Sequence, residues 1–108
     1  MWEARARRLV TLAGHAGDEE TARAGLTDEA TTVRAASLGA LARMDRLATT
    51  DLVAALADPA RDVRRRAVIA LAPFQGPAVD AALERARQDR DWQVRQAAED
   101  LTDEPTER

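Results

Sequence analysis

The chain has 108 residues, of which 45% are hydrophobic and 32% charged, a balance typical of one small folded domain. Its formal net charge of −3 argues against a protein that is basic as a whole, as many nucleic-acid-binding proteins are. Cysteine is absent, which excludes disulfides, thiolate metal sites and cysteine nucleophiles. No segment resembles a signal peptide or a membrane span, so a cytoplasmic protein without membrane contact is expected.

Helices are predicted along the whole chain from the spacing of the apolar residues. A first amphipathic stretch, ARARRLVTLA, is followed by the turn GHAGD and then by further amphipathic segments separated by turns. The segments expected to be helical are 4–13, 19–26, 31–42, 50–57, 59–72, 77–88 and 92–101. The residues expected to cap helices are Asp18, Thr50, Asp58 and Asp89. Pro59 would then occupy the first helical position after Asp58, where its missing N–H is not needed.

One pattern recurs along the chain. TTVRAASLGALA (31–42) and RDVRRRAVIALA (61–72) align without a gap, WQVRQAAEDL (92–101) follows in the same register, and a fainter copy lies at 4–13. The aligned anchor residues, spaced 29 to 31 residues apart, are Ala4, Val33, Val63 and Val94. A helix pair of this length cannot cover its own apolar faces, because each helix has only one neighbour. Neighbouring pairs must therefore stack into an α-solenoid.

The repeat L-x-D-x-x-x-x-V-R-x-x-A, followed by Ala-Leu-Ala, resembles HEAT repeats, most closely the short variety named after phycobilin lyases. The best copies are LADPARDVRRRAVIALA (56–72) and LTDEATTVRAASLGALA (26–42). The resemblance implies an all-α, HEAT-like superhelix of about three and a half helix hairpins over residues 1–102. The acidic segment 103–108 is expected to be a disordered tail.

The resemblance also implies a ladder in which the aspartates of the turns pair with the arginines that follow the valines. Its members would be Asp28, Asp58 and Asp89 with Arg34, Arg64 and Arg95. Arg5, in the first copy, has no evident aspartate. Guanidinium and carboxylate groups that pair in this way require a defined geometry. Arg64, the first of three consecutive arginines, is therefore expected to be structural.

A second role is predicted for the exposed row of the same helices, which would line the concave face of a solenoid. The residues expected to contact a partner are Arg5, Arg34, Arg65, Ile69 and Arg95. Such a cationic strip would suit an acidic peptide, a phosphate or a nucleic-acid backbone. The alternative is that these arginines are solvated or paired within the chain, as Asp62 and Arg66 would be at a spacing of one helical turn.

Two apolar residues, Val68 and Ile69, follow the three arginines, and a buried position is predicted only for the first. Val68 lies in register with Leu38 and Leu9, and this column is expected to be buried. Ile69 either packs against the neighbouring helix or lies exposed beside Arg65 in a mixed apolar and cationic patch. The sequence leaves both alternatives open.

No catalytic residue, metal ligand or cofactor site is predicted. His15 stands in a glycine-bounded turn, without a partner at metal-binding or nucleophile spacing. Asp91 and Trp92 are similar to the acidic and Trp residues of HEAT-like DNA glycosylases, but Trp92 is expected to pack at the last turn. Bilin lyase activity is implied by the resemblance alone. The favoured function is a non-catalytic protein-interaction or scaffold module, and nucleic-acid or phosphate binding through the Arg strip is the alternative.

Overall fold

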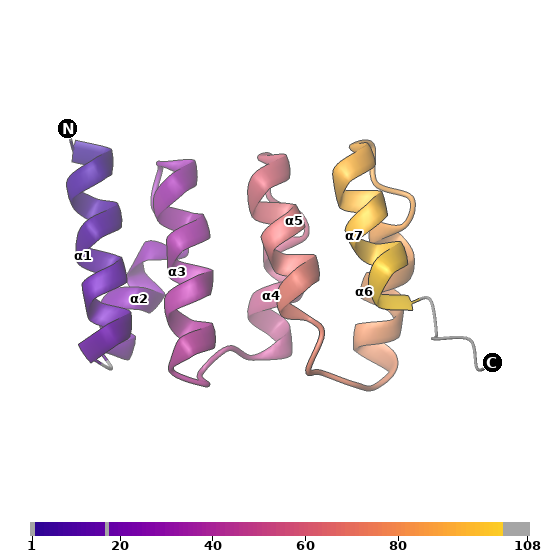
Figure 1. Ribbon diagram of the computed structural model, residues 1–108, viewed down its shortest axis with the longest axis horizontal. Helices are drawn as coiled ribbons and strands as arrows, with labels where there is room; N and C mark the ends of the chain where they lie inside the picture. The colour runs from indigo at the N-terminus through magenta and orange to yellow at the C-terminus, as the bar shows by residue number, and fades with distance from the viewer. Residues whose placement is uncertain (1, 17, 103–108) are drawn as a thin grey trace. The chain divides into compact units, whose positions relative to one another are not determined.

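The computed structural model describes residues 2–16 and 18–102, and every regular element within them is an α-helix. The seven helices in these residues are α1 (Trp2–Ala16), α2 (Glu19–Gly25), α3 (Thr31–Arg43), α4 (Thr49–Ala55), α5 (Arg61–Ala70), α6 (Pro77–Ala86) and α7 (Trp92–Thr102) (Figure 1). They form two compact units, Met1–Ala48 and Thr49–Arg108. The prediction of an all-α chain of helix hairpins is confirmed. The predicted disordered tail, 103–108, lies outside the described residues.

Most predicted helix boundaries hold to within a few residues, and the exceptions have local causes. Helix α1 continues to Ala16, through most of the segment expected to be a turn. Asp18 caps α2 as predicted, because its carboxylate accepts hydrogen bonds from the Thr21 N–H at 3.2 Å and the Thr21 hydroxyl at 2.7 Å. Thr50 does not cap α4, since it lies within the first turn of that helix.

Asp58 is not the cap of α5, which begins at Arg61 and is preceded by Ala60. The Asp58 side chain instead accepts a hydrogen bond from the Ala60 N–H at 2.8 Å. This bond to the residue two positions ahead is an Asx turn, and it competes with capping for the same carboxylate. The helix therefore starts two residues later than predicted, and Pro59 lies in the turn before it.

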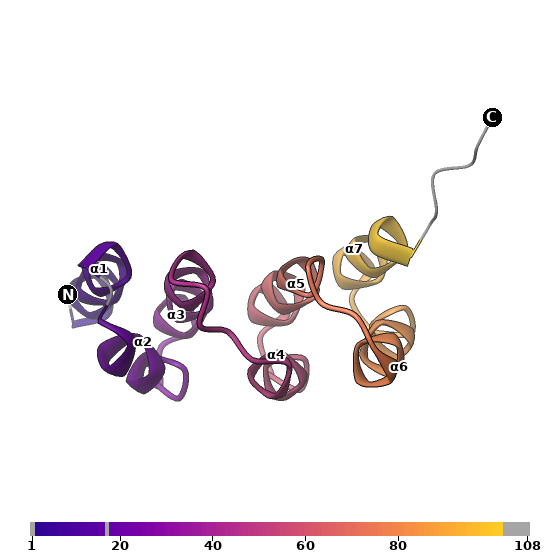
Figure 2. The ribbon, with the colours of Figure 1, turned by 90° about the horizontal axis from the view of Figure 1, so that it is seen from below.

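In the first unit, α1 and α3 lie side by side and α2 packs against both (Figures 1 and 2). The buried cluster of this unit comprises Val10, Ala22, Val33, Ala40 and Leu41. The prediction that Leu9 is buried is wrong, because Leu9 is 55% exposed and its neighbour Val10 faces the core. Helix α1 turns the face with Ala6 and Val10 toward α3.

In the second unit, α5 and α7 form one layer and α4 and α6 the other (Figure 2). Its buried cluster comprises Val68, Ala86, Val94, Ala97 and Ala98, so Val68 is a core residue as predicted. Leu52 of α4 is also fully buried. Gly76 enters α6 with a φ of 120°, a conformation that favours glycine, and Pro77 takes the first helical position.

Candidate functional site

Arg64, the first of the three consecutive arginines, is a buried part of the framework with an exposed fraction of 3%. Its Nη1 donates to the carbonyl oxygens of Asp58 at 2.8 Å and Pro59 at 3.1 Å. Its Nε and Nη2 donate to the two carboxylate oxygens of Asp89 at 2.9 and 3.1 Å. We call this bidentate pair between consecutive hairpins a rung. The rung ties the turn before α5 to the turn before α7.

The same turn occurs in all three repeats. The carboxylates of Asp28, Asp58 and Asp89 each accept a hydrogen bond from the backbone N–H two residues ahead, at 2.8 to 2.9 Å. This bond turns the aspartate carbonyl toward the arginine six residues later. Arg34 donates to the carbonyl of Asp28 at 2.9 Å, and Arg95 donates to that of Asp89 at 2.7 Å. Each of these arginines therefore holds the turn of its own repeat.

The residues predicted as a partner-binding strip do not share one environment. Arg34 and Arg95 are half-buried and bonded to turn carbonyls, whereas Arg5, Arg65 and Ile69 are exposed. Arg5 makes no hydrogen bond or ion pair among the described residues, and Ala6 takes the inward place next to it. The structure brings Arg65 and Ile69 together, one turn apart on α5.

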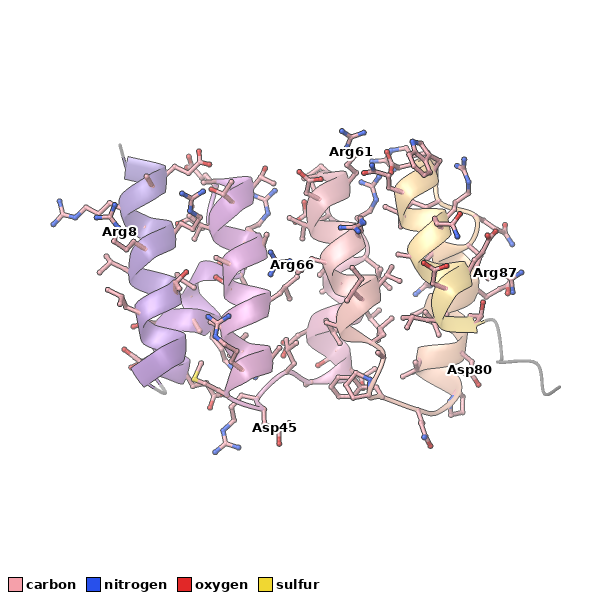
Figure 3. The ribbon with its side chains drawn as sticks, viewed as in Figure 1. Arg8, Asp45, Arg61, Arg66, Asp80 and Arg87 are labelled. Carbon is pink, nitrogen blue, oxygen red and sulfur yellow. The ribbon has the colours of Figure 1, made fainter. Side chains whose placement is uncertain are left out.

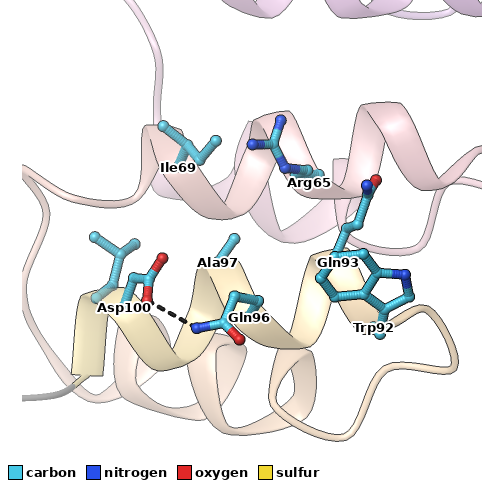
Figure 4. Close-up of a pocket in the computed structure, with 8 residues that line it drawn as sticks. Arg65, Ile69, Trp92, Gln93, Gln96, Ala97 and Asp100 are labelled. Carbon is cyan, nitrogen blue, oxygen red and sulfur yellow. Dashed lines mark hydrogen bonds between the residues drawn. The ribbon is translucent and has the colours of Figure 1, made fainter.

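Arg65 and Ile69 line a hollow between α5 and α7 (Figure 4). It has a volume of about 240 Å³ and is lined by Arg65, Ile69, Trp92, Gln93, Gln96, Ala97, Asp100 and Leu101. We call this site the α5–α7 hollow. Trp92 and Gln93 lie at one end of it, and Ile69 and Asp100 lie at the other. Ile69 is 46% exposed and Trp92 61% exposed, so the hollow presents two large apolar side chains to solvent.

The cation of the α5–α7 hollow is unpaired. Within the described part of the chain, the Arg65 guanidinium has no hydrogen-bond or ion-pair partner, and the same holds for the exposed Arg66 (Figure 3). The expected pair between Asp62 and Arg66 is not formed, because the Asp62 carboxylate instead lies 4.0 Å from Arg61. At the other end of the hollow, the Asp100 carboxylate accepts a hydrogen bond from the Gln96 amide at 3.0 Å. Arg65 is thus available for an external anion.

Asp91 serves the fold. Its Oδ1 accepts hydrogen bonds from the N–H groups of Gln93 at 2.9 Å and Val94 at 3.3 Å, as the capping residue of α7 does. Its Oδ2 lies 3.3 Å from Nη1 of Arg61. Burial alone would raise the pKa of Asp91, but these hydrogen bonds and the Arg61 charge outweigh it, and the pKa lies below its ordinary value of 3.8.

The lowered pKa of Asp91 predicts an acid-sensitive contribution to stability. The contribution is complete above the unfolded-state pKa and is lost as the pH falls through the lower folded-state value. Asp91→Asn retains a capping oxygen but removes the charge beside Arg61. We expect this variant to be less stable than the native chain in urea unfolding at about pH 7, with a difference that shrinks toward about pH 2. A difference that does not depend on pH would contradict this explanation.

Trp92 is a candidate contact residue that the sequence does not predict. It was expected to pack at the last turn, but its indole lies at the rim of the α5–α7 hollow (Figure 4). The repeat alignment already carried the signal, since Trp92 stands in the column of Thr31 and Arg61, two polar residues. A large aromatic residue in a polar column is a candidate contact residue.

The residues that the structure describes show neither a metal-binding cluster nor a membrane-spanning helix. Residues 2–16 and 18–102 hold no group of three or more His, Asp or Glu residues that could bind a metal ion. The side chain of His15 lies outside the described part. None of the helices in these ranges has the length and apolar character needed to cross a membrane. The α5–α7 hollow offers a guanidinium, an indole, amides and an aliphatic side chain, which are groups found at protein-binding surfaces.

Comparison with protein families matches residues 19–101 to HEAT repeats. The match is to HEAT repeats in general and does not single out the phycobilin-lyase variety. No curated protein and no solved structure gives a match. HEAT repeats generally mediate protein interactions or scaffolding and are typically non-catalytic. The matched segment covers most of the chain and contains the three Asp-turn repeats with their rung, and the protein therefore belongs to the HEAT-repeat family.

Proposed function

We propose that the protein is a non-catalytic, cytoplasmic protein-interaction module and that the α5–α7 hollow is its contact site. The observation that supports this most directly is the grouping of an unpaired arginine with two exposed apolar side chains, Ile69 and Trp92. Trp and Arg are the residues most enriched among those that dominate binding energy at protein interfaces. Isolated exposed apolar residues are common, whereas a hollow that combines these three types indicates a contact surface.

The partner proposed for the hollow is an acidic peptide segment with one large apolar side chain. A volume of about 240 Å³ lies below the range of roughly 300 to 1,000 Å³ that is usual for small-molecule pockets, and it suits a single side chain. That side chain would lie over Ala97, between Ile69 and the aliphatic stem of Arg65. A neighbouring carboxylate of the partner would pair with Arg65, while Asp100 would repel an acid at the opposite end.

This proposal is narrower than the strip expected from the sequence. Arg34 and Arg95 each donate to the carbonyl of the turn aspartate in their own repeat, at 2.9 and 2.7 Å, so part of each guanidinium is already engaged. Arg65 has no such engagement among the described residues. The contact residues proposed for the hollow are accordingly Arg65, Ile69 and Trp92.

The test compares proteins captured by the native chain with those captured by an Arg65→Ala/Ile69→Ala/Trp92→Ala variant. Arg66→Ala is the matched control, since Arg66 is also exposed and unpaired but does not line the hollow. We expect the captured partner to be lost by the triple variant and retained by the control. Loss of roughly 2 kcal/mol or more of binding free energy, about thirtyfold in affinity, is expected for anchors of this kind. Equal capture by all three chains would refute the proposal.

Nucleic-acid or phosphate binding is the second candidate, because Arg65, which is unpaired among the described residues, and the exposed indole of Trp92 line the same hollow and also suit a single-stranded nucleic acid. The salt dependence of the binding affinity distinguishes nucleic-acid binding from peptide binding. Binding to a phosphate backbone weakens steeply with salt, by an order of magnitude or more between roughly 50 and 200 mM when several phosphates are contacted. A peptide anchored by apolar contacts with Ile69 and Trp92 should lose far less affinity over the same range.

A further inference from the structure

Arg64 and Arg95 occupy the same position in consecutive repeats, and their environments differ in one respect. Each donates Nη1 to the carbonyl of the aspartate six residues earlier, at 2.8 Å for Arg64 and 2.7 Å for Arg95. The Nε and Nη2 groups of Arg64 bind both carboxylate oxygens of Asp89, which lies 25 residues further along the chain. Arg95 has no second partner among the described residues. Its Nε and Nη2 edge is therefore an unfilled half of a rung.

The nearby carboxylates on the described residues have other partners or do not pair with Arg95. Asp89 is engaged by Arg64, and Asp91 is engaged by Arg61 and by the N-terminal N–H groups of α7. Glu99 lies one turn further along α7, is exposed, and forms no ion pair with Arg95. The bond from Nη1 to the Asp89 carbonyl orients the planar guanidinium, so its free edge is set in advance for a bidentate ligand.

We propose that the Nε and Nη2 edge of Arg95 is a carboxylate-binding site, filled by an acidic side chain of a partner protein that docks against the exposed side of α7. The partner's carboxylate would bind Arg95 as Asp89 binds Arg64, with two parallel N–H···O bonds. The inference rests on the proposed function in requiring a protein partner. It concerns a different surface, because Arg95 does not line the α5–α7 hollow.

The site is tested directly by titrating the full chain with sodium acetate as the probe and following the arginine Nε–H signals by NMR. Sodium chloride at equal ionic strength is the reference. We expect the Arg95 signal to move saturably with acetate and at least fivefold more than with chloride. The Arg64 signal should stay unchanged, because the Asp89 carboxylate already occupies the corresponding edge of that guanidinium. The signal of the exposed Arg66 should drift without saturating.

Two further chains make the result decisive. Arg95→Lys, which lacks the planar bidentate edge, should lose the preference for acetate at this position, as judged from the neighbouring amide signals. An Arg95 signal that responds equally to acetate and chloride, or that behaves like Arg66, would overturn the site. A chain ending at Thr102 lacks the acidic segment 103–108. If its removal alone changes the Arg95 signal and opens acetate binding, the protein's own tail is the ligand and the proposed partner is wrong.

The outcome is independent of the α5–α7 hollow. The Ile69→Ala/Trp92→Ala chain should bind acetate at Arg95 like the native chain, since Arg95 does not line the hollow and its guanidinium is held by the Asp89 carbonyl. Failure of the hollow in partner capture would thus leave the Arg95 titration intact. Conversely, an unresponsive Arg95 with normal loss of capture by the hollow variant would remove only the carboxylate site.

Discussion

Arg64→Ala is expected to lower the free energy of unfolding by about 3 to 5 kcal/mol, the usual cost of removing one partner from a buried ion pair. The change leaves the Asp89 carboxylate without its cation and the carbonyls of Asp58 and Pro59 without their donor. It also opens a cavity where a buried side chain with an exposed fraction of 3% was packed. The loss should appear as a lower midpoint in urea unfolding followed by circular dichroism.

The two arginines that follow provide matched controls for Arg64. Arg65→Ala and Arg66→Ala remove the same atoms from the same helix, but both side chains are exposed and unpaired among the described residues. Each should change the free energy of unfolding by no more than about 0.5 kcal/mol. Arg64→Lys should lie between the extremes, because an ammonium keeps the charge but cannot make both carboxylate bonds with one planar edge. Three equal losses would show that the rung contributes nothing specific to stability.

Gly25→Ala is the second large effect, with an expected destabilisation of about 1 to 3 kcal/mol. Gly25 is the last residue of α2 and is buried where α2 approaches α1 and α3. A β-carbon at this position would overlap with the Ser37 hydroxyl oxygen and lie 3.1 Å from a methyl group of Val10. Either the Ser37 hydroxyl would have to rotate away from its bond to the Val33 carbonyl, or the helices would have to separate. Urea unfolding of the variant should show the loss directly.

A double variant isolates the cause of this loss. Ser37→Ala removes the oxygen that would overlap, and its own cost should be small because the Ser37 hydroxyl is bonded only to the Val33 carbonyl of the same helix. Gly25→Ala/Ser37→Ala should therefore recover part of the stability that Gly25→Ala loses, with a favourable coupling of about 1 kcal/mol. Additive losses in the two single variants would mean that helix approach at Gly25 is not the reason.

The repeat itself could be predicted from the sequence, because its spacing and its Val-Arg pairs are local features that survive without coordinates. The role of the turn aspartates could be predicted only in part from the sequence. Asp58 has the sequence context of a helix cap, and only the structure reveals that its carboxylate closes an Asx turn while its carbonyl binds Arg64. Capping and Asx turns use the same atoms, so sequence alone does not separate them.

The wrong predictions for the burial of Leu9 and Trp92 have a different cause. Aligning 4–13 with the other copies predicts that Leu9 lies in the core, but this first copy matches the others only faintly, and in the structure Val10 turns inward instead. For Trp92, the sequence analysis predicts packing at the last turn, whereas the side chain is 61% exposed. Its exposure is consistent with the repeat register, in which it stands in the column of Thr31 and Arg61.

The rung between Arg64 and Asp89 also governs how the second unit melts. If α6 and α7 detached while α4 and α5 stayed folded, the Arg64 guanidinium would remain desolvated by its own hairpin but would have lost its counter-ion. Such a half-melted intermediate is penalised by the same buried charge that stabilises the intact pair. The rung thus acts as a nearest-neighbour coupling between hairpins, and it makes two small, marginally stable elements melt cooperatively.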